Sequence, residues 1–244
     1  MARHLIASAG LALLLQGCAG LPADQAQGTP AERVARDSML SLQANGVSVG
    51  AAVAVRDAAT GAALLLTNAH VTRQAGEGLT ARRADGQPMG AVRVLATSTR
   101  MDLAVLSLPE STLTPASPGT APRPGAPVWA MGPEGLGRAL ASGAVERPSL
   151  RLRRFGLGFT ARLGALMGFS GGPVVARDGR VLGLTTALGD SGADPVVASL
   201  TGMDLGGLAG EGREVFVLSI QEAVAEARRL TAQPSAATQR VAAR

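Results

Sequence analysis

The sequence predicts an all-β protein made of two β-rich halves, with a helix at the C-terminal end. Three observations carry this prediction. The 244 residues include 32 glycines and 14 prolines, and so many turn-forming residues favour strands over long helices. From Leu40 onward, apolar residues recur at a period of two, which is typical of half-buried strands. A stretch rich in proline, serine and threonine, residues 109–127, has the composition of an interdomain linker.

The first 17 residues resemble a signal peptide of the lipoprotein type. A short positive start, residues 1–4, precedes the apolar run Leu5–Leu15, which is too short to span a bilayer. Leu15-Gln16-Gly17-Cys18 then resembles a bacterial lipobox, so Cys18 is expected to carry a lipid. The alternative is ordinary secretion, with cleavage after the small residues Gly17-Cys18-Ala19.

Lipidation of Cys18 would anchor the protein to a membrane of the bacterial cell envelope, facing the periplasm. Alanine rather than aspartate follows the cysteine, and in lipoproteins that this segment resembles, this choice favours the outer membrane over the inner one.

Residues 18–37 are expected to form a tether and a short helix, because Thr29-Pro30-Ala31-Glu32 has the pattern of a capping box with proline at the first helical position. Residues 38–108 form the first β-rich half. Its strands are predicted by alternation and by flanking turn residues, and they cover Val47–Val55, Leu64–Thr67, Leu79–Arg83, Met89–Ala96 and Leu103–Leu108.

Residues 128–230 form the second β-rich half. Strands are predicted at Val128–Met131, Ala139–Val145, Leu150–Phe155, Phe159–Leu163, Pro173–Ala176, Val181–Leu188 and Val215–Ile220, followed by an amphipathic helix over Gln221–Leu230. Residues 189–213 are glycine-rich without a period, and they fit either a loop that orders when substrate binds or a tolerated surface insertion. Residues 231–244 are expected to be a flexible tail.

Composition argues against several classes of function. The basic residues are all arginine, and their densest cluster, residues 151–154, has none of the interleaved aromatic residues of a surface that binds nucleic acid, so no nucleic-acid partner is expected. One cysteine and two histidines offer no paired spacing of metal ligands. The glycine-rich runs contain no lysine for a phosphate loop. We therefore expect no metal and no other cofactor.

Three short motifs follow one another in the order histidine, aspartate, serine. Ser170 lies in Gly168-Phe169-Ser170-Gly171-Gly172-Pro173, where glycines let a substrate carbonyl approach the main chain. His70 lies in Thr67-Asn68-Ala69-His70-Val71, and Asp102 opens an apolar run. A serine hydroxyl needs a neighbouring base, and a carboxylate can hold that base in one tautomer. Each residue alone also fits a structural role, as a turn serine, a core histidine or an aspartate that caps a strand.

These motifs resemble those of the trypsin-like (chymotrypsin-fold) serine peptidases, and most closely the protease domain of the bacterial HtrA/Deg proteins without a PDZ domain. The run Gly183-Leu184-Thr185-Thr186-Ala187 also resembles this family, and the whole resemblance covers about residues 40–230. It implies two antiparallel six-stranded Greek-key β-barrels, the first carrying His70 and Asp102 and the second Ser170. Phe169 departs from the family, which usually has asparagine or aspartate before the serine.

The resemblance further implies a serine endopeptidase of the cell envelope that cleaves polypeptides through an acyl-enzyme. The amides of Gly168 and Ser170 would form the oxyanion hole. Gly164 would lie at the base of the specificity pocket, whose wall would be Thr186, Ala187 and Leu188. No acidic residue falls at that base, so cleavage after basic residues is not expected, and Leu188 favours small or medium aliphatic side chains. The alternative function is a catalytically inactive or latent module that binds peptides or envelope proteins.

Overall fold

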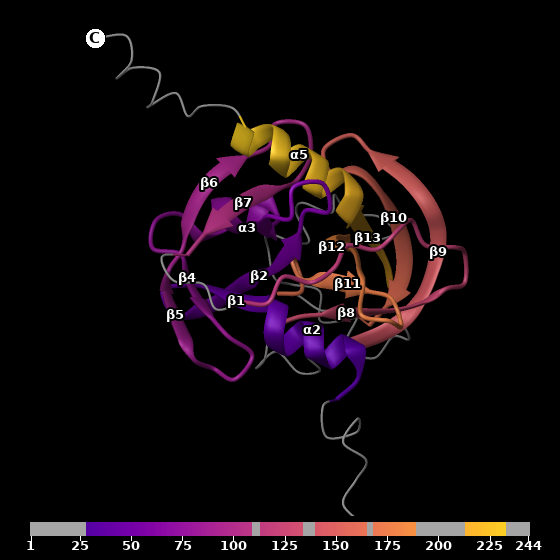
Figure 1. Cartoon of the computed structure of the whole chain (residues 1–244), viewed down its shortest axis with the longest axis horizontal. Helices are drawn as coiled ribbons and strands as arrows, with labels where there is room; N and C mark the ends of the chain where they lie inside the picture. Colours follow the sequence, from indigo (N-terminus) through magenta and orange to yellow (C-terminus); the bar gives the residue numbers. More distant parts are fainter. Residues whose placement is uncertain (1–27, 109–112, 134–139, 165–167, 189–212, 233–244) are drawn as a thin grey trace, which may run out of the picture.

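The computed structural model describes residues 28–108, 113–133, 140–164, 168–188 and 213–232, and its strands form two sheets that lie side by side (Figure 1). The first half contains α2 (Pro30–Ser38), β1 (Met39–Ala44), β2 (Val47–Arg56), β3 (Ala63–Thr67), α3 (Ala69–Ala75), β4 (Thr80–Arg82), β5 (Pro88–Ala91), β6 (Arg93–Thr97) and β7 (Ala104–Ser107). The second half contains β8 (Pro127–Met131), β9 (Leu140–Leu152), β10 (Gly156–Leu163), β11 (Pro173–Val175), β12 (Val181–Leu188), β13 (Arg213–Ser219) and α5 (Ile220–Ala232).

The short helix predicted before the first sheet is present as α2. The hydroxyl of Thr29 accepts a hydrogen bond from the amide of Glu32 at 3.2 Å, and the carboxylate of Glu32 accepts one from the amide of Thr29 at 2.6 Å. Pro30 occupies the first helical position. The capping box predicted from the sequence is thus confirmed, and it defines where the helix begins.

The first sheet has the strand order β5-β4-β1-β2-β3-β7-β6. Its two outer strands, β5 and β6, are separated by Val92 alone, whose amide donates a hydrogen bond of 2.8 Å to the carbonyl oxygen of Leu79. β5 and β6 therefore act as one strongly bent strand that borders both ends of the sheet. Counted in this way, the half has the six strands expected of the first barrel.

The second sheet is a closed barrel of six strands in the order β10-β13-β12-β11-β8-β9. The sequence predicted two strands within residues 139–155, but β9 runs without a break from Leu140 to Leu152. The register against β10 shifts opposite Pro148 and Ser149. Proline has no amide to give to the ladder, and a bulge accommodates it without ending the strand.

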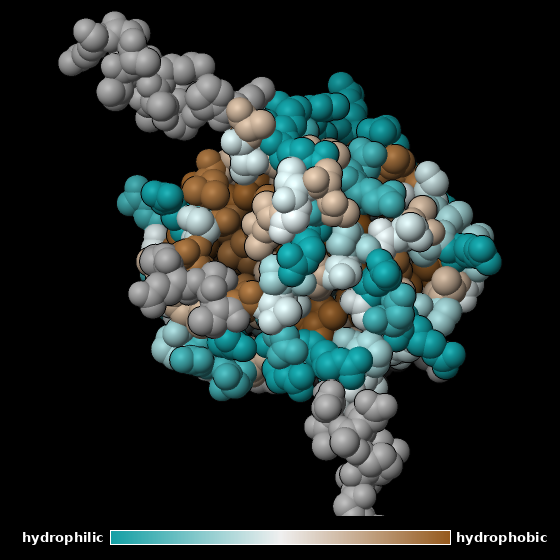
Figure 2. All heavy atoms as spheres, in the orientation of Figure 1, coloured by the Kyte–Doolittle hydropathy of each residue, from teal (hydrophilic) through white to brown (hydrophobic). Residues whose placement is uncertain are grey.

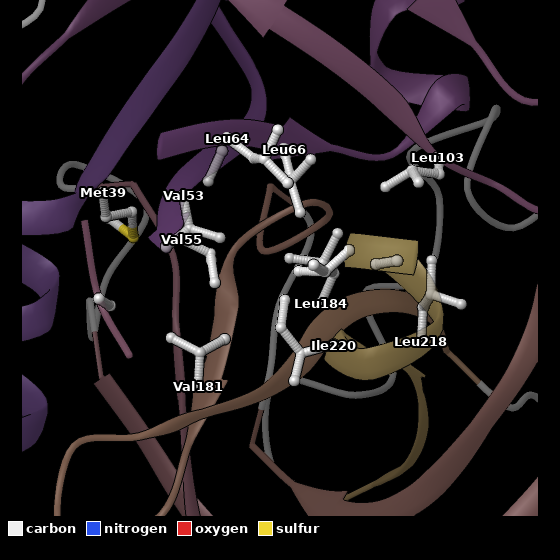
Figure 3. Close-up of a cluster of buried hydrophobic side chains, with 14 of the residues drawn as sticks. Met39, Val53, Val55, Leu64, Leu66, Leu103, Val181, Leu184, Leu218 and Ile220 are labelled. Atoms are coloured by element: carbon white, nitrogen blue, oxygen red, sulfur yellow. The ribbon is translucent and has the colours of Figure 1, made fainter. Parts of the chain in front are cut away.

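The largest cluster of buried apolar side chains joins the two halves. Leu64 and Leu66 on β3 belong to the same cluster as Leu184 on β12 and Ile220 at the start of α5, and Figure 3 shows side chains from both halves meeting there. Each half also has its own smaller core. The all-β double-barrel architecture with a C-terminal helix, expected from the sequence, is therefore confirmed.

The described part of the proline-rich segment, residues 113–127, is packed between the two halves. The carbonyl oxygen of Ala116 accepts a hydrogen bond of 2.9 Å from the amide of Arg56, and the amide of Val181 donates one of 2.9 Å to the carbonyl oxygen of Ser117. These bonds tie β2 of the first half and β12 of the second to one stretch of chain. The segment that composition identifies as a linker therefore also holds the halves together.

Helix α5 packs against β12 and β13 of the second half and also against β3 and β6 of the first. Figure 1 shows it in yellow, lying across the top of both barrels. On the face shown in Figure 2, hydrophilic side chains cover α2 and much of α5, whereas apolar residues are visible around β6 and β7. In the part of the chain that the structure describes, no helix is both long and apolar enough to cross a membrane.

Candidate active site

His70 and Asp102 form a close pair in the first half. His70 lies in the first turn of α3, directly after β3. Its Nδ1 atom lies 2.5 Å from Asp102 Oδ2, and its main-chain amide donates a hydrogen bond of 2.9 Å to Asp102 Oδ1. A carboxylate can only accept hydrogen bonds, so the Nδ1 atom carries the proton in this arrangement. The lone pair of the neutral ring is then on Nε2, which is free to act as a base.

The Asp102 carboxylate is more deeply buried than the His70 ring. The Asp102 carboxylate is 4% exposed and the His70 ring is 16% exposed. The guanidinium of Arg73 lies 3.9 Å from Asp102 Oδ1, but that side chain is 66% exposed, so solvent screens its charge. The two hydrogen bonds from His70 are therefore the main stabilisation of the buried carboxylate.

A network that reaches α5 supports the turn before Asp102. The hydroxyl of Ser98 donates a hydrogen bond of 2.6 Å to Glu226 Oε1 and accepts one of 3.0 Å from the amide of Arg100. The Glu226 carboxylate also accepts hydrogen bonds from the guanidinium of Arg229, both at 2.8 Å. These bonds lower the pKa of Glu226 to about 2. The hydrogen bonds from Arg229 make the largest contribution and the one from Ser98 adds to it, whereas burial of the carboxylate raises the pKa.

Ser170 lies in a tight turn between the two halves. The amide of Gly172 donates a hydrogen bond of 2.9 Å to the carbonyl oxygen of Phe169. Gly171 has φ +80°, as the third residue of a type II turn requires, and Ser170 is the second. A Cβ atom on Gly171 would overlap the carbonyl oxygen of Ala51 and the hydroxyl of Thr67. Glycine is needed here both for its backbone conformation and for the close contact.

Both halves hold this serine turn. The carbonyl oxygen of Ser170 accepts a hydrogen bond of 2.8 Å from the amide of Ala51 on β2. On the other side, the amide of Gly171 donates one of 2.9 Å to the carbonyl oxygen of Thr185 on β12, and the amide of Thr185 returns one of 2.9 Å to Gly172. The structure thus brings Ser170 against the segment that leads into His70. Among the described residues, no hydrogen bond joins the Ser170 hydroxyl to the His70 ring.

Asn68 links the same three regions, and sequence reasoning gave it no role. Its side-chain amide is fully buried and donates hydrogen bonds of 3.0 Å to the carbonyl oxygen of Asp102 and 3.1 Å to the hydroxyl of Thr186. The available signal was an asparagine two residues before the histidine in an otherwise apolar frame, because a buried amide needs hydrogen-bond partners. Asn68 therefore ties β12 of the second half to the turn that carries Asp102.

The residues expected to form the specificity pocket are only partly described. Thr186 is buried, and its hydroxyl donates a hydrogen bond of 2.9 Å to the carbonyl oxygen of Leu184. The same hydroxyl accepts the bond from Asn68, so Thr186 takes part in the contact between the two halves. Ala187 and Leu188 end β12, and their side chains lie outside the described residues. Gly164 is exposed just after β10, with open space around it.

Gly168, expected to supply an oxyanion-hole amide, has φ +90° and precedes the serine turn. Cys18 and most of the glycine-rich loop, residues 189–212, lie outside the described residues. Within the described ranges there is no group of three His, Cys, Asp or Glu side chains that could hold a metal ion.

Solved structures similar to this chain have the same fold. An inactive form of Rv3671c from M. tuberculosis H37Rv, a serine-to-alanine mutant, superposes with TM-score 0.64 at 18% identity, covering 88% of this chain and 97% of that one. The active form of the Rv3671c protease from M. tuberculosis gives TM-score 0.63 at 17% identity, covering 95% and 96%. The HtrA-type protease AlgW with decapeptide gives TM-score 0.60 at 19% identity, covering 82% and 66%.

At these identities the likeness establishes the fold, and the sequence itself establishes the family. No curated protein is significantly similar in sequence to this chain. Residues 44–184 match the Trypsin-like peptidase domain, which covers His70, Asp102 and Ser170 and more than half of the 244 residues. The chain therefore belongs to the trypsin-like peptidase family and is a serine protease.

Proposed function

We propose that the chain is an endopeptidase that cleaves peptide bonds with Ser170 as nucleophile, His70 as general base and Asp102 as the group that orients the base. The observation that carries the proposal is the double contact between His70 and Asp102, through the ring nitrogen at 2.5 Å and the main-chain amide at 2.9 Å. The serine turn packs against Ala51 and against Thr67, which lies three residues before His70. This contact supports placing the third residue, Ser170, near the pair.

In this mechanism, Ser170 Oγ attacks the carbonyl carbon of the scissile peptide bond while its proton passes to His70 Nε2. The imidazolium that forms keeps its proton on Nδ1 and donates it in a hydrogen bond to the buried Asp102 carboxylate, which stabilises the positive charge. The amides of Gly168 and Ser170 would bind the negative oxygen of the tetrahedral intermediate. One such donor is typically worth about 3–4 kcal/mol in the transition state.

The intermediate then collapses, and the C–N bond breaks as His70 Nε2 gives its proton to the leaving amine. The first product leaves, and the acyl group remains as an ester on Ser170. Water attacks this ester with His70 again as base, and release of the acid restores the serine hydroxyl. No cofactor is needed, because the side chains of this chain carry out each proton transfer.

Labelling with a fluorophosphonate probe tests this proposal. The reagent should form one adduct on the purified protein, located at Ser170 by mass spectrometry. Ser170→Ala should abolish the adduct and His70→Ala should slow its formation by orders of magnitude, with both variants folded by circular dichroism. Labelling that is independent of His70, or an adduct elsewhere, would disprove the assignment.

A latent module that binds peptides is the second candidate. It is favoured by the missing hydrogen bond between Ser170 and His70 among the described residues and by Phe169, which replaces the polar residue usual in this family. A folded protein that resists the probe yet binds unfolded polypeptides, with binding unchanged in Ser170→Ala, would support this candidate over the protease.

Polypeptides are the proposed substrates, and the AlgW structure with decapeptide supports this class. We further propose that Gly164 and the end of β12, Thr186–Leu188, shape a pocket for small or medium aliphatic side chains. A peptide-library cleavage profile should show Ala, Val or Leu before the cut. Preference for arginine or lysine at that position would overturn the assignment.

We also propose that the protein acts in the bacterial cell envelope, anchored through lipid on Cys18 and facing the periplasm, on the outer rather than the inner membrane. The lipobox-like sequence before Cys18 supports this proposal. Intact-mass analysis of the N-terminal peptide should show a diacylglyceryl modification that Cys18→Ala removes. An unmodified chain beginning at Gly20 would mean ordinary secretion instead.

A further inference from the structure

The residue before the proposed nucleophile points away from it, into the core of the second barrel. Phe169 is 1% exposed, whereas Ser170 is partly exposed. Phe169 belongs to the same cluster of buried side chains as Val128, Phe159 and Val174. The backbone at this point thus places an apolar ring in the interior and the neighbouring hydroxyl outside it.

The ring fills a space that only a glycine opposite it provides. Gly132 directly follows β8, and a Cβ atom built on it would lie within 2.8 Å of three ring atoms of Phe169, namely Cδ2, Cε2 and Cγ. The φ of Gly132 is outside the left-handed region, so its backbone conformation does not require glycine. The absence of a side chain at Gly132 is therefore required by the ring.

The same ring is attached to the start of the serine turn. The carbonyl oxygen of Phe169 accepts the hydrogen bond from Gly172 that closes the turn, at 2.9 Å. A Cβ atom on Gly172 would overlap the carbonyl oxygen of Met131, so the far end of the turn lies directly on the end of β8. Displacing the ring from Gly132 would therefore move both ends of the turn relative to β8.

We propose that Phe169 is a positioning residue for Ser170, with its ring seated over Gly132 as the apolar anchor of the serine turn. In the family that this motif resembles, a polar residue usually occupies this position, and a polar group buried in this cluster would need hydrogen-bond partners. The ring needs only the complementary space. The inference rests on the proposed function for the claim that Ser170 reacts, but the anchoring itself is a separate property of the turn.

The test uses Gly132→Ala, which pushes the ring out of its seat without changing Phe169 or the serine motif. The matched control is Gly119→Ala, whose Cβ would lie 2.8 Å from Leu182 Cδ2, another side chain of the same core cluster. A second matched pair is Phe169→Leu against Phe159→Leu, because both rings are about equally buried in one core. The variants are compared by thermal unfolding, fluorophosphonate labelling rate and amide hydrogen exchange of the serine turn.

We expect Gly132→Ala to slow labelling at least tenfold at temperatures where it is fully folded, because small displacements of reacting groups cost up to about a hundredfold in rate. Exchange at the amides of Gly171 and Gly172 should rise at the same time. Gly119→Ala and Phe159→Leu should lower the unfolding temperature. Their labelling rates should stay within twofold of the rate for the unsubstituted protein. Adding Phe169→Leu to Gly132→Ala should restore part of the labelling rate.

The outcomes separate this inference from the proposed function. If the unsubstituted protein labels but Gly132→Ala labels and exchanges as the Gly119→Ala control does, the anchor is disproved and the nucleophile stands. If the unsubstituted protein does not label but Gly132→Ala selectively raises exchange in the serine turn, the anchor stands and the catalytic assignment fails. Equal exchange in all variants disproves the anchor in either case.

Discussion

The main-chain amide of Ala51 donates a hydrogen bond of 2.8 Å to the carbonyl oxygen of Ser170. The donor is on β2 of the first half and the acceptor is on the serine turn of the second. The proposed nucleophile is therefore positioned by its main chain against the same barrel that carries His70 and Asp102.

Replacing Gly171 by alanine should separate the serine turn from β2. The added Cβ would overlap Ala51 O and Thr67 Oγ1, in addition to the strain of its φ of +80°. We expect probe labelling to be lost and the free energy of unfolding to fall by more than the strain alone. Gly86→Ala is the matched control, with φ +81° and open space around it, and should cost only about 1–2 kcal/mol. Equal losses in urea unfolding would contradict this account.

Two adjacent threonines on β12 should respond oppositely to valine. Thr185 and Thr186 are both 3% exposed. The Thr186 hydroxyl bonds to Asn68 and Leu184, whereas no described residue bonds the Thr185 hydroxyl. Thr186→Val should leave the Asn68 amide without one acceptor and cost about 1–3 kcal/mol. Thr185→Val should be neutral or stabilising. Denaturant titrations measure the free energy of unfolding of both variants. A larger loss of this free energy for Thr185→Val than for Thr186→Val would disprove the role of the Thr186 hydroxyl as partner of Asn68.

The stability should depend on pH through Glu226. Its pKa in the folded protein is about 2, below the ordinary 4.5, first because of the hydrogen bonds from Arg229 and then because of Ser98. A lowered folded-state pKa contributes stability that is complete above the unfolded pKa and is lost as the pH falls toward the folded one. The stability gap between the unsubstituted protein and Glu226→Gln should thus be constant above about pH 5 and shrink between pH 4.5 and 2.

Urea unfolding of both proteins at several pH values measures this gap. Glu222→Gln is the control on the same helix, because it removes a carboxylate that forms no ion pair with any described residue and leaves the Ser98 and Arg229 contacts of Glu226 intact. A gap that persists unchanged at pH 2.5 for Glu226→Gln would show that the network is not ionic. Loss of probe labelling in Glu226→Gln, at pH 7 and fully folded, would extend its role to Asp102 through Ser98.

Local patterns in the sequence were sufficient to predict most strands, the capping box of α2 and the helix α5, because alternation and capping are properties of neighbouring residues. Local patterns failed for elements whose structure depends on residues distant in the sequence. Helix α3 has only seven residues, with two β-branched residues in its middle, and gave no helical period. The break predicted within β9 is a bulge, which depends on the register against β10.

The same limit applies to the site. The motifs around His70, Asp102 and Ser170 were recognisable because each stands in a short apolar or glycine-rich frame. The seat of Phe169 over Gly132 is a contact between residues far apart in sequence, and nothing local to either residue reveals it. The link from Asn68 to Thr186 is of the same kind. Tertiary hydrogen bonds and packing determine these relationships, so they could be read only from the structure.

Asp102→Asn should preserve the fold and remove most of the activity. The carboxylate accepts one bond from the His70 ring and another from the His70 amide, so both its oxygens are used. An asparagine has one oxygen, and if that oxygen keeps the main-chain amide, its NH₂ group faces Nδ1. Nδ1 must then accept, the proton moves to Nε2, and the ring can no longer act as a base toward Ser170.

In another serine protease this change lowers kcat by about 10⁴, and we expect probe labelling here to slow by a similar factor. The matched control is Asp57→Asn, a second buried aspartate, which accepts two hydrogen bonds from Arg228, at 2.9 and 2.7 Å, far from the serine turn in sequence. Asp57→Asn should lower the unfolding temperature and leave the labelling rate of the folded protein within twofold. If Asp57→Asn slowed labelling as much as Asp102→Asn, the effect would reflect loss of a buried charge in general, and Asp102 would have no special role in orienting His70.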